Sequence, residues 1–227
     1  MEQVVFHDWN LSEAAAFELQ CQLAARVERN DRLDSVNTVA GVDVAYDEKS
    51  DRLVAAAVVL EATSLAIIEH AIAEDVARFP YVPGLFSFRE LPSIAQALTQ
   101  LRCKPDLVIC DGQGIAHPRR FGMACHVGIL FDVPAIGCGK TLLRGAHGEV
   151  GSIRGDYAPL IEDGETIGRV LRTQDRIKPV YVSVGHRVSL STASSWVLAL
   201  CAKYRLPETT RIADQLVRRI LNRRSHQ

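Results

Sequence analysis

Apolar residues along this 227-residue chain gather in short runs that alternate with amphipathic stretches, a pattern typical of α/β proteins. The first three runs, at residues 39–46, 53–60 and 65–73, are joined by short turns and predict an antiparallel meander. Two later runs, at 107–110 and 133–137, are too short for helices and predict buried parallel strands.

Apolar residues at helical spacing predict helices over about 10–27, 92–101, 118–131, 191–204 and 209–221. The first is expected to start at a capping box formed by Asn10 and Glu13, and the third at Pro118. Asp163-Gly164 predicts a hairpin between two short strands, and residues 180–184 predict one more strand.

Three antiparallel strands followed by helix, strand, helix and strand is the element order of a ribonuclease-H-like fold. We therefore expect one α/β domain over residues 1–227, in which helices flank a mixed central sheet of three antiparallel and then two parallel strands. In that topology the first strand lies beside the fourth.

Two carboxylates mark those neighbouring strands. Asp43 interrupts the first strand and Asp111 ends the fourth, at the sheet edge where ligands of α/β proteins bind. Close carboxylates repel each other unless a cation lies between them, and Mg²⁺ prefers such oxygen ligands. Glu90 can add a third ligand and Asp214 is a candidate fourth, although Asp214 could simply pair with Arg218 one helical turn later. The pattern indicates metal-assisted phosphodiester hydrolysis.

Basic residues lie close to this edge. Lys140 follows the fifth apolar run, in the sequence Gly-Lys-Thr, which resembles the end of a phosphate-binding P-loop. That motif needs a glycine where Pro134 stands, so an NTPase is excluded. Arg119 and Arg120 are expected in the first turn of a helix, where cations oppose the helix dipole and favour a bound polyanion.

The loop Phe79–Phe86 contains two prolines that hold an aromatic side chain outward. Pro80 and Pro83 restrict the backbone on either side of Tyr81, which cannot easily retract. Gly112 and Gly114, after the fourth strand, allow a ligand to approach the backbone closely.

Composition narrows the class of protein. Hydrophobic residues make up 48% of the chain, and no uninterrupted apolar stretch reaches membrane-spanning length. The six cysteines have no disulfide-framework pattern, which favours a reducing cytoplasm. Cys110, Cys125 and Cys138 lack zinc-site spacing, lie in apolar runs and are expected to be buried. The net charge of −1 neither favours nor excludes nucleic acid, although residues 203–224 are locally basic.

Five segments of the chain, 39–46, 80–92, 111–121, 137–141 and 204–214, resemble the motifs of the endonuclease V family, which cleaves DNA near deoxyinosine. The resemblance implies that Asp43, Glu90 and Asp111 bind Mg²⁺, for which Mn²⁺ substitutes. It also places His117 and Lys140 near the scissile phosphate.

The same resemblance implies that Tyr81, between Pro80 and Pro83, wedges the strands apart. The lesion base would enter a pocket formed by the backbone of Gly84, Leu85, Gly112 and Gln113, with Arg119 and Arg120 also on the DNA side. Cleavage is expected at the second phosphodiester 3′ to the lesion, leaving 3′-hydroxyl and 5′-phosphate ends.

The expected partner is deoxyinosine-containing DNA, single- or double-stranded, with inosine-containing RNA as a further candidate. The protein itself is expected to be a monomer. Two other readings stay open. The chain could bind inosine-containing nucleic acid without cutting it, or it could be a ribonuclease-H-like nuclease for inosine RNA or branched DNA.

Overall fold

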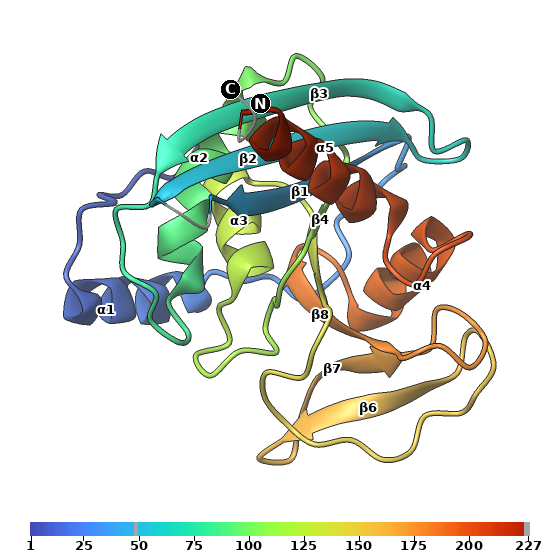
Figure 1. Ribbon diagram of the computed structural model, residues 1–227. Coiled ribbons are helices and arrows are strands. Elements are labelled where there is room, and N and C mark those ends of the chain that lie inside the picture. Colours follow the sequence, from blue (N-terminus) through green and yellow to red (C-terminus); the bar gives the residue numbers. More distant parts are fainter. Residues whose placement is uncertain (48–49, 225–227) are drawn as a thin grey trace.

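The computed structural model describes residues 1–47 and 50–224, and eight strands within them form one mixed sheet (Figure 1). The strands are β1 (Thr38–Tyr46), β2 (Arg52–Glu61), β3 (Ile67–Val76), β4 (Leu107–Cys110), β5 (Ala135–Gly139), β6 (Tyr157–Glu162), β7 (Glu165–Leu171) and β8 (Val180–His186). Their order across the sheet is β3-β2-β1-β4-β5-β8-β7-β6.

The first five strands have the predicted ribonuclease-H-like arrangement. β1, β2 and β3 form an antiparallel meander, and β1 pairs in parallel with β4, which pairs in parallel with β5. The predicted hairpin at Asp163-Gly164 is also present, between β6 and β7. The sequence did not show that the sheet continues beyond β5, where β8 pairs antiparallel with β5, β7 with β8 and β6 with β7, so treating β4 and β5 as its last strands was wrong. The β5–β8 pairing joins segments more than forty residues apart in the sequence, which local periodicity does not report.

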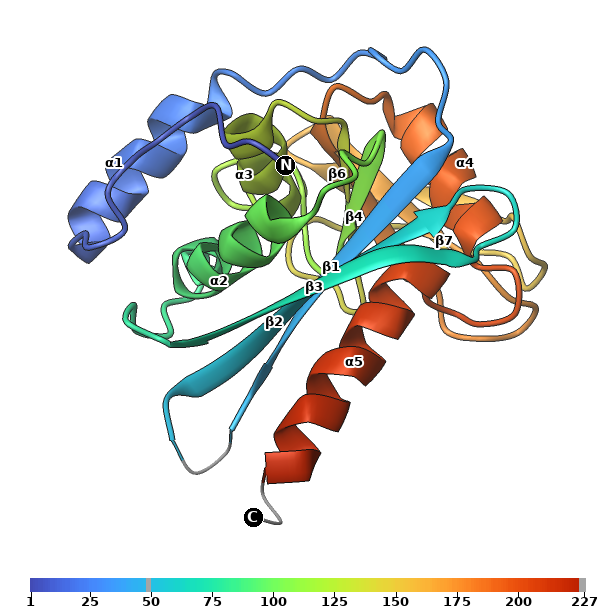
Figure 2. The same cartoon turned by 90° about the horizontal axis from the view of Figure 1, so that it is seen from above.

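Helices cover both faces of the sheet (Figure 2). They are α1 (Glu13–Ala24), α2 (Phe86–Gln100), α3 (Met123–Phe131), α4 (Leu190–Leu200) and α5 (Glu208–Arg224). α2 and α3 pack on one face, whereas α5 crosses β1 and β2 on the other and α4 packs on β8. No helix in the described ranges is long and apolar enough to cross a membrane.

Three helix starts differ from the sequence prediction. The N-cap of α1 is Ser12, not Asn10, because the Ser12 hydroxyl accepts a hydrogen bond from the Ala15 amide at 3.2 Å. α2 begins at Phe86, so Pro92 lies inside the helix and Glu90 lies beyond its first turn.

The third difference concerns α3, which begins after Gly122 rather than at Pro118. The Gly122 amide donates to the Gly114 carbonyl at 3.0 Å, and a Cβ at Gly122 would lie 2.2 Å from the Gln113 carbonyl oxygen. This close packing of two loops holds residues 118–122 in irregular backbone. Arg119 and Arg120 are therefore not in the first turn of a helix.

Gly41 lets α5 approach the sheet. A Cβ on this β1 residue would lie 2.3 Å from the carbonyl carbon of Thr209 and 2.5 Å from its oxygen. Helix backbone therefore rests directly on strand backbone, and this contact fixes the position of Asp214 further along α5.

We expect Gly41→Ala to lower the free energy of unfolding by about 1–3 kcal/mol, because the helix must move to admit the methyl group. Gly148→Ala is the matched control, since a Cβ there meets nothing within 4 Å. Urea denaturation of both variants measures the effect, and equal stabilities would show that α5 does not depend on this contact.

Candidate active site

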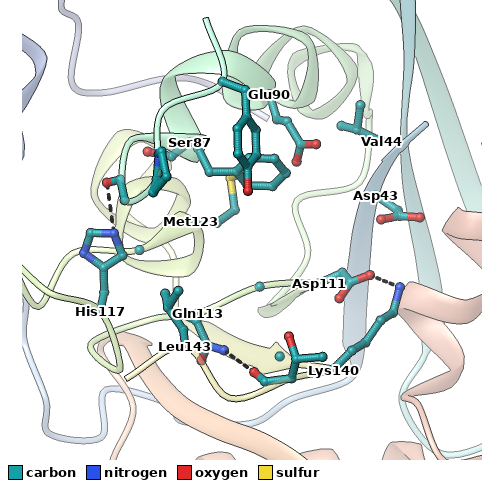
Figure 3. A pocket seen from close by; sticks show the side chains of 18 of the residues that line it. Asp43, Val44, Ser87, Glu90, Asp111, Gln113, His117, Met123, Lys140 and Leu143 are labelled. Carbon is teal, nitrogen blue, oxygen red and sulfur yellow. Dashed lines mark hydrogen bonds and ion pairs between the residues drawn. The ribbon is translucent and has the colours of Figure 1, made fainter. Parts of the chain in front are cut away.

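A cavity of about 450 Å³ opens at the carboxyl ends of β1, β4 and β5 (Figure 3). Most of the residues predicted from the sequence line it: Asp43, Tyr81, Pro83, Gly84, Glu90, Asp111, Gly112, Gln113, His117, Lys140 and Asp214. Pro80, Leu85, Arg119 and Arg120 are not among its lining residues. The cavity thus unites the acidic residues and the proline-containing loop.

Asp43 and Asp111 are brought together by parallel strand pairing. Val42 of β1 lies opposite Cys110 of β4, so the carboxylates that follow them are neighbours. Burial and the Asp111 charge raise the pKa of Asp43 to about 8. Two adjacent carboxylates in a partly buried site cannot both ionise freely without positive charge nearby.

Lys140 supplies positive charge in this structure. It follows β5, and its ammonium forms an ion pair with the Asp111 carboxylate (Figure 3). Burial opposes the charged form, but the hydrogen bond to Asp111 and the charges of Asp111, Asp43 and Asp214 together raise the pKa of Lys140 above its usual value. Asp214 itself pairs with Arg218 at 2.7 Å, which was the simple alternative that the sequence left open.

Glu90 projects from α2 toward the same acidic group. Its side chain is only 7% exposed, and the Tyr46 hydroxyl donates to its Oε1 at 2.9 Å. Burial raises the pKa of Glu90 to about 8, and the charges of Asp43 and Asp111 act in the same direction although the Tyr46 hydrogen bond opposes them. Tyr46 was not identified from the sequence, because its partner lies 44 residues away.

The donor chemistry of this acidic group fits Mg²⁺. Among the described residues, no three His, Cys, Asp or Glu side chains converge closely enough to hold a metal ion together. Mg²⁺ needs fewer protein ligands, because it is usually bound by one or two carboxylates together with water and substrate phosphate. Asp43 and Asp111 meet that requirement, and metal binding by these two residues, by Glu90 or by Asp214 stays a prediction.

His117 lies away from the carboxylates, against the proline-containing loop (Figure 3). Burial and the nearby Arg119 guanidinium lower its pKa to about 4, so the ring is neutral. Its Nε2–H donates to the Gly84 carbonyl at 3.0 Å, and its Nδ1 accepts from the Arg119 amide at 3.2 Å. In this structure His117 therefore braces the loop, and a contact with the scissile phosphate stays a prediction.

The loop displays an aromatic side chain between fixed ends, as the sequence predicted. Tyr81 is 71% exposed, whereas Phe79 and Leu85 at the ends of the loop are buried. The Arg89 guanidinium donates to the Phe79 carbonyl at 2.7 Å. An exposed ring on anchored backbone can act on a ligand because little conformational entropy remains to be lost.

Arg119 and Arg120 make different contacts. Arg119 donates to the Gly84 carbonyl at 2.5 Å and to the side chain of Gln20, a buried residue that the sequence reading missed. Arg120 pairs with Glu162 at 2.6 Å and Glu165 at 2.7 Å, which ties the loop before α3 to the β6–β7 hairpin. A DNA contact by either arginine stays a prediction.

Gln20 could have been suspected from the sequence, because a polar residue interrupts the apolar stripe of α1 at this position. In the structure its side chain is only 1% exposed. It donates to the carbonyls of Gly84 at 3.0 Å and Phe121 at 2.7 Å. Leu143 also lines the cavity and was missed, because it lies in a stretch that reads as polar and irregular.

A ribonuclease-H-like sheet with paired carboxylates at its parallel edge defines a nuclease class that acts on phosphodiesters. The family model for endonuclease V matches residues 21–215. The chain belongs to the endonuclease V family and is a nuclease.

Three relatives show the extent of the likeness. Endonuclease V from Azotobacter vinelandii is 49% identical over 214 residues, which cover 94% of this chain and 97% of that protein. The crystal structure of endonuclease V from Streptomyces avermitilis is 47% identical, with a TM-score of 0.91 over 96% of each chain. Endonuclease V from Ciona intestinalis, 27% identical, gives a TM-score of 0.83 over 92% of this chain and 98% of that one. Its crystal is a complex with a 24mer DNA that contains an inosine followed by a ribo-adenosine.

We expect Arg120→Ala to lower the free energy of unfolding by about 1 kcal/mol, because Glu162 and Glu165 would then keep one cation each, Arg144 and Arg29, in place of two. Arg52→Ala is the comparison variant. It removes a 3.5 Å ion pair between Glu74 and Arg52, whose side chain is 56% exposed, and should lower the free energy of unfolding less. Thermal unfolding compares the two variants. If Arg120→Ala is as stable as Arg52→Ala, its ion pairs are not structural.

Proposed function

We propose that this nuclease is a Mg²⁺-dependent DNA repair endonuclease that recognises deoxyinosine, the product of adenine deamination. The observation that carries the proposal is a single cavity lined both by the Asp43–Asp111 carboxylates and by the loop that displays Tyr81. The inosine-containing DNA bound by the Ciona relative supports the same substrate class.

Asp43 and Asp111 would hold the metal ion, which when bound would activate water and screen phosphate charge. Mn²⁺ would substitute for Mg²⁺ at the same oxygen ligands. Lys140 contributes a fixed positive charge beside Asp111, where negative charge develops on the phosphoryl oxygens. Glu90, held by the Tyr46 hydroxyl, keeps a further oxygen acceptor near this group.

The lesion base would be turned out of the stack and held near Gly84 and Gln113, which line the same cavity as the carboxylates. His117 and Arg119 both donate to the Gly84 carbonyl, so this wall of the cavity is fixed before DNA arrives. Separate places for the base and for the phosphate account for cleavage displaced from the lesion. We propose that the second phosphodiester 3′ to the lesion is cut, leaving 3′-hydroxyl and 5′-phosphate ends.

Two other functions make different demands on the site. A protein that only binds inosine would not need the Asp43–Asp111 pair, which lies in the same cavity. A nuclease for branched DNA would not need an exposed ring on a rigid loop to open a duplex. Inosine-containing RNA carries the same base and is tested as a second substrate.

The proposal is tested with matched oligonucleotides that contain one inosine or one adenosine, as single and double strands and as DNA and RNA. We expect Mg²⁺-dependent cleavage of the inosine DNA at one position, with the product ends mapped on a sequencing ladder. If the protein binds the inosine strands but cleaves them at no Mg²⁺ concentration, it is an inosine-binding protein and not an enzyme. If it cuts adenosine strands as fast as inosine strands, it does not recognise the lesion.

Asp43→Asn and Asp111→Asn should each reduce Mg²⁺-dependent cleavage to background while the protein stays folded. The amide keeps the shape of the carboxylate but loses the charge that attracts the cation. Circular dichroism checks the fold, and binding to inosine DNA should persist. Near-normal turnover of either variant at saturating Mg²⁺ would remove these residues from the metal site.

Tyr81→Ala should reduce the preference for inosine in duplex DNA more than in single strands. A ring stacked on a base contributes about 1–3 kcal/mol, and only duplex DNA needs its strands separated. Because Tyr81 is 71% exposed, the melting temperature should not change. Lower melting temperature with intact selectivity would instead show that the ring supports the fold.

A further inference from the structure

The C-terminal half of α5 carries a basic face that the proposed mechanism does not use. Residues 215–223 contain three arginines and no acidic residue, although the whole chain has a net charge of −1. Exposed polar side chains at helical spacing line an open hollow along this part of the helix: Gln215, Arg218, Arg219, Asn222 and Arg223. We call these five residues the α5 face.

The helix dipole does not account for this charge. Cations stabilise the last turn of a helix, but the effect falls off within that turn. α5 ends at Arg224, so Arg218 and Arg219 lie more than one turn before its end. Arg218 pairs with Asp214 at 2.7 Å. No carboxylate in the described ranges forms an ion pair with Arg219 or Arg223, which are therefore available to bind an anion.

The α5 face continues the candidate active site. Arg218 lines both the hollow and the main cavity, and its partner Asp214 also lines the cavity. The hydrogen bond and charge of Asp214, with a smaller contribution from the charge of Asp43, raise the pKa of Arg218. Arg218 thus lies at the carboxylate end of the cavity. A strand whose phosphate lies at the carboxylates can therefore continue onto α5.

The direction of that strand rests on the proposed function. His117 and the Gly84 carbonyl, which border the place for the base, lie away from the carboxylates (Figure 3). Because the proposed cut is on the 3′ side of the lesion, a strand that passes from the base to the carboxylates runs from 5′ to 3′. The nucleotides that follow the cut then reach Arg218 and the rest of the α5 face.

We propose that the α5 face binds phosphates of the substrate strand on the 3′ side of the cut, through Arg219 and Arg223. Guanidinium groups bind phosphate oxygens by paired hydrogen bonds, and such contacts supply affinity without reading the base sequence. From residue 215 to residue 223 the helix rises about 12 Å, compared with about 3.4 Å between successive nucleotides of a duplex strand. The face is therefore long enough for more than one phosphate.

The test uses the double variant Arg219→Gln/Arg223→Gln, which removes two cations and leaves Arg218 in place beside the cavity. Glutamine forms helices well, so α5 should persist. Arg102→Gln/Lys104→Gln is the matched control, because both side chains are exposed and precede β4, at the opposite end of this strand from the cavity. Thermal unfolding checks that both double variants are folded.

Binding to single strands is measured by fluorescence anisotropy in EDTA, so that the strands stay intact. An inosine strand with long flanks is compared with one shortened on the 3′ side just beyond the expected cut, one shortened on the 5′ side, and an adenosine strand with long flanks. We expect Arg219→Gln/Arg223→Gln to weaken binding to the long inosine strand and to the 5′-shortened strand by about five- to tenfold. The slope of log Kd against log salt concentration should become shallower by about 1.4, because two phosphate contacts are lost.

On the 3′-shortened strand the variant should bind as the wild type does, and Arg102→Gln/Lys104→Gln should match the wild type on every strand. Equal weakening on the 3′-shortened strand, weakening that depends on the 5′ flank, or unchanged binding would each overturn the proposal. Lesion recognition is measured separately in the wild type. Equal affinity for the inosine and adenosine strands would contradict the proposed function, whereas a loss that follows the 3′ flank would still support binding by the α5 face.

Discussion

Electrostatic repulsion between Asp43 and Asp111 is the constraint on which the site depends. Parallel pairing of β1 with β4 makes these carboxylates neighbours, and burial prevents water from screening them fully. The Lys140 ammonium offsets this repulsion by its ion pair with Asp111. The proposed divalent cation would offset it further, together with substrate phosphate.

The other end of the cavity depends on hydrogen bonding to one carbonyl. The Gly84 oxygen accepts from Gln20, His117 and Arg119, which come from α1 and from the loop before α3. These bonds fix the backbone next to Tyr81, so a base can be received without first ordering the loop. In the proposed function, base recognition and hydrolysis would share this cavity but use separate groups within it, as a cut displaced from the lesion requires.

Much of the fold could be predicted because strand and helix periodicities are local signals. The meander, the parallel β1–β4–β5 unit and the convergence of Asp43, Glu90, Asp111 and Lys140 on one cavity all follow from element order. The start of α3 could not be predicted, because close packing of Gly122 on Gln113 overrides the preference of Pro118 for a helix start. Likewise, Tyr46 and Leu143 reach the site through contacts between segments far apart in the sequence, which no local pattern reports.

Calorimetric titration of Mg²⁺ into the DNA-free protein tests whether the carboxylates at the β1–β4 edge bind a divalent cation. We expect saturable heat for the wild type and none for Asp43→Asn. Asp163→Asn, which changes a carboxylate in the β6–β7 turn, should titrate like the wild type. Absence of saturable heat in the wild type, or an unchanged titration of Asp43→Asn, would contradict the account.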